Sequence, residues 1–276
     1  ITIMLAMGVS RMARRQAIIR KLPAVETLGS ISVICSDKTG TLTQNEMTVQ
    51  EMYTAAGGYS VDGSGYNPDG EIKPIGGDAA AIDFKAFREC LKCGVLCNDS
   101  MLSDNEGQWQ IDGDPTEGAL IVAAAKAGID VELLRGQLPR EDEIPFDSGR
   151  QYMATLHSDP TTGERCIYMK GAVETILNRC ASTLNGNGDP IELNHSETLQ
   201  AATDLAAKGL RVLTFAKSKP LTGDQEIDTA ETADDLIFLG FQAMMDPPRE
   251  STYVAVDNCR RAGIEIKMIT GDHALT

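Results

Sequence analysis

Two short apolar runs, each ended by a polar turn, stand near opposite ends of the 276-residue chain. Residues 31–37 are rich in β-branched side chains and precede a turn containing Gly40, so they predict a buried strand with Asp37 at its carboxyl end. Residues 264–269 follow a helical pattern over 254–262, a rhythm typical of parallel sheets with functional groups at strand ends. We therefore expect a doubly wound α/β domain interrupted by an insertion of roughly 200 residues, a size within the usual domain range.

The insertion has a different pattern, which predicts an α+β body with an antiparallel sheet. Expected strands cover 47–53, 152–157, 165–169, 211–216 and 236–243, expected helices cover 79–96, 116–127 and 197–207, and glycine-rich loops lie near 57–77. The domain boundaries that follow are 1–21, 22–46, 47–245 and 246–276.

The charge balance restricts the partners. Lys and Arg number 25 against 40 Asp and Glu, a formal net charge of −15, which argues against nucleic-acid binding because phosphate backbones are held by basic patches. A pocket for a single nucleotide needs only a few local cations and backbone N–H groups, so ATP is not excluded. With 42% hydrophobic and 24% charged residues, the chain has the composition of a folded domain.

The seven cysteines fit a reducing cytosol better than a secreted disulfide scaffold. Cys90, Cys93 and Cys97 have helical spacing and no fourth ligand nearby, so buried helix packing is favoured over a zinc site. The three histidines show no metal-like spacing and are given no role: His157, His195 and His273.

Residues 1–9 are strongly apolar, but at 1.5 Å per residue they reach only about half of a bilayer core. A basic cluster follows, as expected where a membrane helix emerges on the cytoplasmic side: Arg11, Arg14, Arg15, Arg20 and Lys21. We expect residues 1–21 to be the end of a membrane helix and its stalk. A short amphipathic surface helix is the alternative for this segment taken alone.

The run 37–43, Asp-Lys-Thr-Gly-Thr-Leu-Thr, is the strongest chemical signal. A carboxylate at a strand end can act as a nucleophile towards a phosphoryl group. Gly40 allows the turn to adopt positive φ and to bring backbone donors towards a phosphate. The Thr41 hydroxyl can bind the same oxygens, while Asp37 and the Thr39 carbonyl can hold Mg²⁺, which prefers oxygen ligands.

Thr39 also separates two classes of enzyme. Phosphatases of the haloacid-dehalogenase type usually carry a second Asp at this position, which serves as general acid and base and lets water destroy the phosphoenzyme. Without that base, worth about a factor of 10² to 10⁴, an aspartyl phosphate should persist. Persistence suits a pump whose intermediate must survive a conformational change.

The run 37–43, called the signature below, resembles the phosphorylation motif of the P-type ATPases. The flanking runs 14–29 and 43–49 are similar to those of the calcium-pump-like cation transporters. The resemblance extends over essentially all 276 residues. It implies that Asp37 is phosphorylated by ATP with Mg²⁺, with Lys38, Thr39 and Thr41 in the catalytic signature. It further implies a haloacid-dehalogenase-like phosphorylation domain around 22–46 and 246–276, and a nucleotide-binding domain at 47–245.

The resemblance also assigns roles near the second boundary. The run 246–249, Asp-Pro-Pro-Arg, resembles the family's hinge motif, in which Asp246 and Arg249 help to position nucleotide and phosphate. A Pro-Pro pair is equally a stiff linker, and a hinge needs one. The triplet Thr270, Gly271 and Asp272 resembles the next motif, with Thr270 donating to the phosphoryl group and Asp272 near Mg²⁺ and nucleotide.

In the insertion, Lys170 and Gly171 resemble the family's nucleotide-binding lysine motif, although Val173 replaces its usual proline. Phe146 stands where the family stacks an aromatic ring on adenine, a contact worth about 1 to 3 kcal/mol by analogy with base stacking. A lone Phe is more often a core residue, but the flanking Pro145 and the run 147–150 favour the stacking role.

Four further residues complete the expected nucleotide site. Arg150 belongs to the run after Phe146, and Gln151 follows it where relatives commonly have Lys. Asp114 and Glu117 resemble an acidic motif, with Glu117 near the adenine amino group and Asp114 also a helix cap. Arg211 matches an arginine that contacts the phosphate chain.

The resemblance finally implies what this chain lacks. The distal lysine and the Gly-Asp-Gly-Val-Asn-Asp segment of the phosphorylation domain, the actuator motif and nearly all membrane helices are absent, so we expect a soluble piece that binds ATP on the cytoplasmic face of a membrane but is catalytically incomplete. Calcium is the expected ion by resemblance alone. Two rival functions stay open: a soluble phosphatase, and a nucleotide-sensing module without catalysis.

Overall fold

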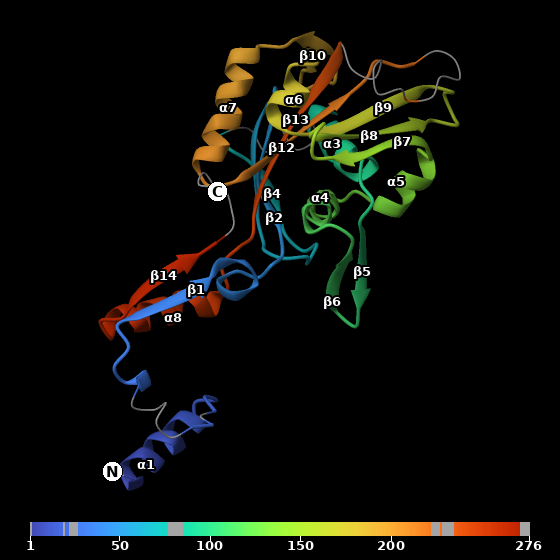
Figure 1. Cartoon of the computed structure of the whole chain (residues 1–276). Coiled ribbons are helices and arrows are strands. Elements are labelled where there is room, and N and C mark those ends of the chain that lie inside the picture. Colours follow the sequence, from blue (N-terminus) through green and yellow to red (C-terminus); the bar gives the residue numbers. More distant parts are fainter. Residues whose placement is uncertain are drawn as a thin grey trace. The chain divides into compact units, whose positions relative to one another are not determined.

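The computed structural model describes residues 2–18, 20–21, 27–76, 85–221, 227 and 235–270. These residues form two compact units (Figure 1). The first contains the described residues up to Gln44 and those from Pro248 onward, and the second contains those from Asn45 to Pro247. The chain therefore leaves the first unit after Gln44 and returns to it after Pro247.

In the first unit, a two-stranded parallel sheet pairs a strand near the start of the chain with a strand near its end. β1 (Val33–Asp37) pairs with β14 (Glu265–Ile269), and Asp37 lies opposite Ile269. α8 (Glu250–Arg261) precedes β14 and packs against it. The prediction that β1 is buried was wrong: its residues alternate between exposed and half-buried, because β14 is its one partner strand in the described part of the chain.

The amino-terminal segment forms a helix, α1 (Thr2–Ala13), with Arg11 in its last turn. Its Met4 and Met7 are exposed. None of the helices in the described ranges combines the length and the apolar character that a membrane crossing requires.

The second unit is built on a mixed sheet whose main path runs β4-β3-β2-β13-β12-β9-β8-β7. Every pairing along this path is antiparallel, as predicted, and only the branch strand β10 runs parallel to β13. A separate hairpin is formed by β5 (Met101–Asn105) and β6 (Gln108–Asp112). The sheet strands are β2 (Thr48–Thr54), β3 (Gly57–Val61), β4 (Ile72–Pro74), β7 (Arg140–Asp147), β8 (Tyr152–Ser158), β9 (Arg165–Gly171), β10 (Cys180–Leu184), β11 (Pro190–Glu192), β12 (Arg211–Lys217) and β13 (Leu236–Met245).

Helices cover both faces of this sheet and enclose a core on each (Figure 1). Successive side chains of a strand point to opposite faces, so Met153 on β8 joins one core while Ala154 joins the other. One face carries α3 (Lys85–Leu96), α4 (Pro115–Lys126) and α5 (Val131–Gln137), and the other carries α6 (Val173–Leu177) and α7 (His195–Ala207).

A bulge in β13 shifts this alternation. The register slips opposite Phe215 and Ala216, where Gly240 has φ +152° and a Cβ would lie 2.4 Å from the Tyr53 carbonyl oxygen. Only glycine fits such a close approach in this conformation. As a result, Phe238 and Phe241 pack in the same core, with their ring centroids 4.9 Å apart.

The three cysteines of α3 and its end are packing residues, as their spacing predicted. Cys90, Cys93 and Cys97 are fully buried, and burial raises the pKa of each thiol. The thiols of Cys93 and Cys97 donate to strand carbonyls, which places α3 directly on the sheet. No group of metal-binding side chains occurs among the residues that the structure describes.

The sequence patterns missed most of the short elements and also β7, an eight-residue strand whose side chains are mostly exposed or half-buried. The region 57–77, expected to be loops, contains β3 and β4, and β5, β6, β7, β10, β11, α5 and α6 were not predicted. The expected helix over 79–96 begins at Lys85, and residues 79–84 lie outside the described ranges. Short strands carry too few residues for a clear alternation, so their pairing depends on neighbours that are distant in sequence.

Candidate functional site

Five of the predicted nucleotide residues lie at one end of the large sheet. Asp147 at the end of β7 is opposite Tyr152 at the start of β8, which in turn is opposite Gly171 at the end of β9. Gly171 is opposite Thr214 on β12. Arg211, the first residue of β12, lies three residues before Thr214. The register therefore brings together Phe146, Arg150, Lys170, Gly171 and Arg211.

Phe146 lies at this end of the sheet, beside a turn that several hydrogen bonds stabilise. Its side chain is 59% exposed, which excludes the core alternative. The Asp147 carboxylate accepts hydrogen bonds from the Gly149 and Arg150 amides at 2.9 and 3.0 Å. The Arg150 guanidinium donates to the Pro145 carbonyl at 3.1 Å. An exposed ring on an ordered turn is available for stacking on a flat ligand.

Gly171 is required by its neighbours on β8. A Cβ at this position would lie 2.4 Å from the Gln151 carbonyl oxygen and 2.8 Å from the Tyr152 Cβ. Gln151 itself has φ 59°, and its side-chain oxygen accepts a hydrogen bond from Thr175 at 3.3 Å. The backbone of Gln151 and Tyr152, at the start of β8, therefore occupies the space that a side chain at position 171 would need.

Lys170 is the main surprise of the site. It is 6% exposed, and its ammonium group donates to the Glu117 carboxylate at 2.5 Å and to the Cys97 carbonyl. The other Glu117 oxygen accepts from the Asp99 amide at 2.9 Å and the Ser100 hydroxyl at 3.5 Å. The buried lysine therefore holds the Glu117 carboxylate in place. No local sequence pattern could predict this ion pair, because its partners are 53 residues apart.

Asp114 caps α4, as its position before Pro115 predicted. Its carboxylate accepts from the Thr116 amide at 2.8 Å and the Glu117 amide at 3.3 Å. This cap satisfies amides of the first helical turn that have no intrahelical partner. The start of α4 thereby sets the position of Glu117. Arg211, by contrast, is exposed at the start of β12.

Asp246 directly follows β13, at the strand end where Met244 lies opposite Arg211. Its carboxylate accepts from the Glu46 amide at 3.2 Å. The phenol of half-buried Tyr66 has a raised pKa. Burial is the largest cause, and the negative charges of Glu46, Asp246 and Asp114 add to it. The two predicted acidic residues Asp114 and Asp246 are thus close to the same tyrosine.

In the first unit, the signature forms a tight turn after β1. Asp37 is exposed at the strand end, and Gly40 has φ 71°, as predicted. Thr43, which is buried, closes the turn: its hydroxyl accepts from the Gly40 amide and donates to the Lys38 carbonyl, both at 3.1 Å. Thr39 and Thr41 are exposed on the turn.

The start of α8 supports the same turn. The Arg249 guanidinium donates to the Gly40 carbonyl at 3.2 Å, and the Arg249 amide donates to the Leu42 carbonyl at 2.9 Å. The Thr252 hydroxyl also donates to the Leu42 carbonyl, at 2.7 Å. Thr43 and Thr252 were not predicted as site residues, although the spacing of Thr43 within the signature could have suggested the first.

Thr270 directly follows Ile269, the residue opposite Asp37, so β14 brings Thr270 to the same end of the small sheet as the signature turn. Gly271 and Asp272, the rest of that predicted motif, lie outside the described residues.

Comparison with known proteins identifies the class. The family described as "P-type ATPase, cytoplasmic domain N" matches residues 86–251, which is more than half of the chain. Together with the mixed α/β fold and its antiparallel sheet, this match shows that the chain belongs to the P-type ATPases.

The relatives place the chain more closely within that family. It is 50% identical over its whole length to "Cation-transporting ATPase pma1" of Synechocystis, 46% to "Probable cation-transporting ATPase F" of Mycobacterium tuberculosis and 37% to "Calcium-transporting ATPase" of Bacillus subtilis. The resemblance to cation and calcium pumps is thus confirmed. The chain spans 30 to 31% of the length of these relatives.

Proposed function

We propose that this chain is the nucleotide-binding and phosphorylation region of an ATP-driven cation pump on the cytoplasmic face of a membrane. The first unit would be part of a haloacid-dehalogenase-like phosphorylation domain, interrupted by the second unit as nucleotide-binding domain. The observation that carries the proposal is the Asp37 turn: an exposed carboxylate at a strand end, before a Gly40 turn held by Thr43 and Arg249. Thr270 ends the adjacent strand.

In the proposed reaction, a carboxylate oxygen of Asp37 attacks the γ-phosphorus of ATP. The new bond joins Asp37 to phosphorus, the bond from phosphorus to the β,γ-bridging oxygen breaks, and ADP leaves with that electron pair. Lys38, Thr41 and Thr270 would bind the transferred phosphoryl oxygens, where positioning and charge stabilisation supply most of the catalysis. Thr39 in place of a second Asp would let the phosphoenzyme persist.

The residues present fit Mg²⁺ as the cofactor. Mg²⁺ takes oxygen ligands and is usually held by one or two carboxylates together with substrate phosphates. The Asp37 carboxylate and the Thr39 carbonyl would hold it, with Asp272 as a further carboxylate of the predicted motif. When bound, Mg²⁺ neutralises charge on the phosphate oxygens.

The nucleotide would bind at the sheet end that presents Phe146. Stacking on the exposed ring, acceptance of the adenine amino group by Glu117 and contact of the phosphates with Arg150 and Arg211 would account for ATP recognition. Lys170 would act on adenine mainly through Glu117. Asp246 and Arg249 would contribute from the hinge, together with Gly271. Asp114 would contribute by capping the helix of Glu117.

The proposed transported ion is Ca²⁺, bound by membrane segments of the intact protein, with an actuator domain as further partner. The motivation is that relatives 37 to 41% identical over this chain are named calcium-transporting ATPases. An ATPase rate of the intact protein that does not respond to Ca²⁺ would remove this ion while leaving the pump proposal standing.

The deciding test uses the intact protein, in membranes, with ATP labelled at the γ-phosphate. We expect an acid-stable, hydroxylamine-sensitive phosphoenzyme, absent in the Asp37→Asn variant and retained in an Asp257→Asn control on the exposed face of α8. ATP binding without any phosphoenzyme would favour the nucleotide-sensing module instead. Rapid release of phosphate from small phosphate esters by the wild type would favour the soluble phosphatase.

A further inference from the structure

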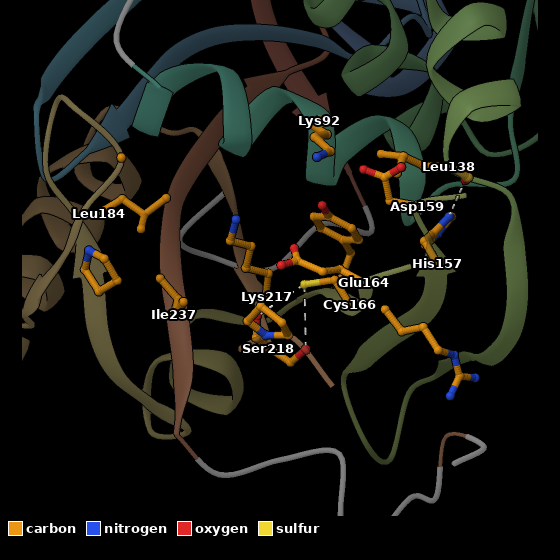
Figure 2. Close-up of a pocket in the computed structure, with 15 residues that line it drawn as sticks. Lys92, Leu138, His157, Asp159, Glu164, Cys166, Leu184, Lys217, Ser218 and Ile237 are labelled. Carbon is orange, nitrogen blue, oxygen red and sulfur yellow. Dashed lines mark hydrogen bonds between the residues drawn. The ribbon is translucent and has the colours of Figure 1, made fainter. Parts of the chain in front are cut away.

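A pocket lies at the opposite end of the strands that carry the candidate nucleotide residues. Figure 2 shows the side chains that line it. The ends concerned are those at Ser158 on β8, Arg165 on β9 and Lys217 on β12, and Ser158 pairs with Arg165. At about 3.3 Å per residue, these seven-residue strands separate the two ends by roughly 20 Å. Nothing in the proposed pump cycle uses this pocket.

Its volume of about 280 Å³ suits a small molecule. That is close to the lower end of the range of about 300 to 1,000 Å³ for small-ligand sites. The wall combines apolar side chains, among them Leu138, Leu184 and Ile237, with a few polar groups. Such a combination can bury an apolar body and orient one polar end.

Two lysines bring their ammonium groups to the pocket. Lys92 comes from α3 and Lys217 from the end of β12, and both side chains enter the pocket (Figure 2). They share one carboxylate, Glu89, at 3.4 and 2.5 Å, and all three side chains are only 21 to 26% exposed. Although burial alone would raise it, the pKa of Glu89 is lowered by these lysines, so the carboxylate stays charged. Within this group of three, two cations share one anion, so neither lysine has a carboxylate of its own here.

Tyr168 supplies an unused donor beside these lysines. The residue lines the pocket and is 3% exposed. Lys92 lies 5.6 Å from its ring centroid, yet within the described ranges its hydroxyl has no hydrogen-bond partner. The hydroxyl is not sealed off from solvent, and it can donate to an acceptor that binds in the pocket.

Further charged groups and one histidine also line the pocket. Arg165 is paired with Glu141 at 2.7 Å. His157 stays neutral near pH 7, because burial lowers its pKa to about 4. Asp159 is half-buried, as Lys92 and Lys217 are, and Glu164 is exposed. These two carboxylates would repel a polyanion such as a nucleotide more strongly than a small monoanion held between the two lysines.

We propose that this pocket binds a small organic monocarboxylate, with its carboxylate between Lys92 and Lys217 and its apolar body against Leu184 and Ile237. The Tyr168 hydroxyl donates to the same carboxylate. The site is independent of ATP binding, so its test does not depend on the proposed pump function.

The test titrates the isotopically labelled 276-residue chain with benzoate and follows backbone amide NMR shifts. We expect saturable shifts at Cys166, Tyr168 and Ser218, and none at Gly171. Benzamide, which has the same shape without the charge, should bind at least about tenfold more weakly, because hydrogen bonds to charged groups are the stronger ones.

Three variants make the inference sharp. Lys217→Met removes the cation but keeps the aliphatic chain and should weaken benzoate about tenfold, whereas Lys217→Arg should retain binding. Glu89→Gln removes the competing carboxylate and should strengthen binding about threefold. Lys73→Met, a remote lysine on β4, is the matched control and should change nothing. Amide spectra of each variant report whether it folds.

Several results would overturn the proposal. These are the absence of saturable shifts with benzoate, equal binding of benzamide and benzoate, or unchanged binding by a folded Lys217→Met chain. Weaker binding by Glu89→Gln would also contradict it, because the charge argument requires the opposite sign.

Discussion

The buried ion pair of Lys170 and Glu117 makes the most demanding prediction. Their side chains are 7 and 15% exposed. Removing one partner of a buried pair leaves an uncompensated charge and costs about 3 to 5 kcal/mol. For Lys170→Met we expect a loss of about 3 kcal/mol, the low end of that range, because Glu117 keeps the Asp99 amide and the Ser100 hydroxyl as donors.

The double variant Lys170→Met, Glu117→Met should recover much of this loss. An apolar pair of similar volume removes both charges together, and such replacements of buried ion pairs are often neutral or stabilising. We therefore expect a coupling energy of about 2 kcal/mol between the two positions. ATP affinity should fall in both variants, since neither contains the fixed carboxylate.

The assay is urea unfolding followed by the fluorescence of the single tryptophan, Trp109 on β6 of the second unit. Unchanged slopes would show that the midpoints report stability. Lys73→Met is the control, since that lysine is exposed and should leave the midpoint unchanged. A Lys170→Met chain that loses less than about 0.5 kcal/mol but no longer binds ATP would refute the structural role and favour a direct phosphate contact.

Three smaller predictions concern single side chains. Asp114→Ala removes the cap of α4 and should cost about 1 kcal/mol in urea unfolding, with Asp114→Asn as the tolerated control. Gly171→Ala places a Cβ 2.4 Å from the Gln151 carbonyl oxygen and should cost about 2 kcal/mol or more, measured in the same way; a neutral effect would contradict the close approach. His157 binds a proton more readily when unfolded, since its pKa is about 4 in the fold against 6.5 in the reference state. Wild-type stability should therefore fall by about 2 to 3 kcal/mol as pH drops from 6.5 to 4, and His157→Asn should lose that part of the slope; parallel pH profiles would refute it.

The sequence predicted the signature turn and most of the long elements, although not β7. β8, β9, β12 and β13 have seven or more residues each and were found within two residues of their true bounds, because their buried faces leave a clear pattern. The left-handed conformation at Gly40 followed from the residue type alone. The cap at Asp114 followed equally, since it satisfies amides only two and three residues away.

Local sequence alone was enough to predict which residues could take part in the chemistry. These are a strand-end aspartate with its turn, an aromatic ring beside Pro145, a capped helix and a lysine followed by glycine. Only the tertiary structure decided that Lys170 is buried against Glu117, that Gly171 accommodates β8, and that Lys92 and Lys217 share Glu89 at the far end of the strands. The physical reason is sequence distance: caps and turns are made between near neighbours, whereas an ion pair depends on strand register and on how a helix lies across the sheet.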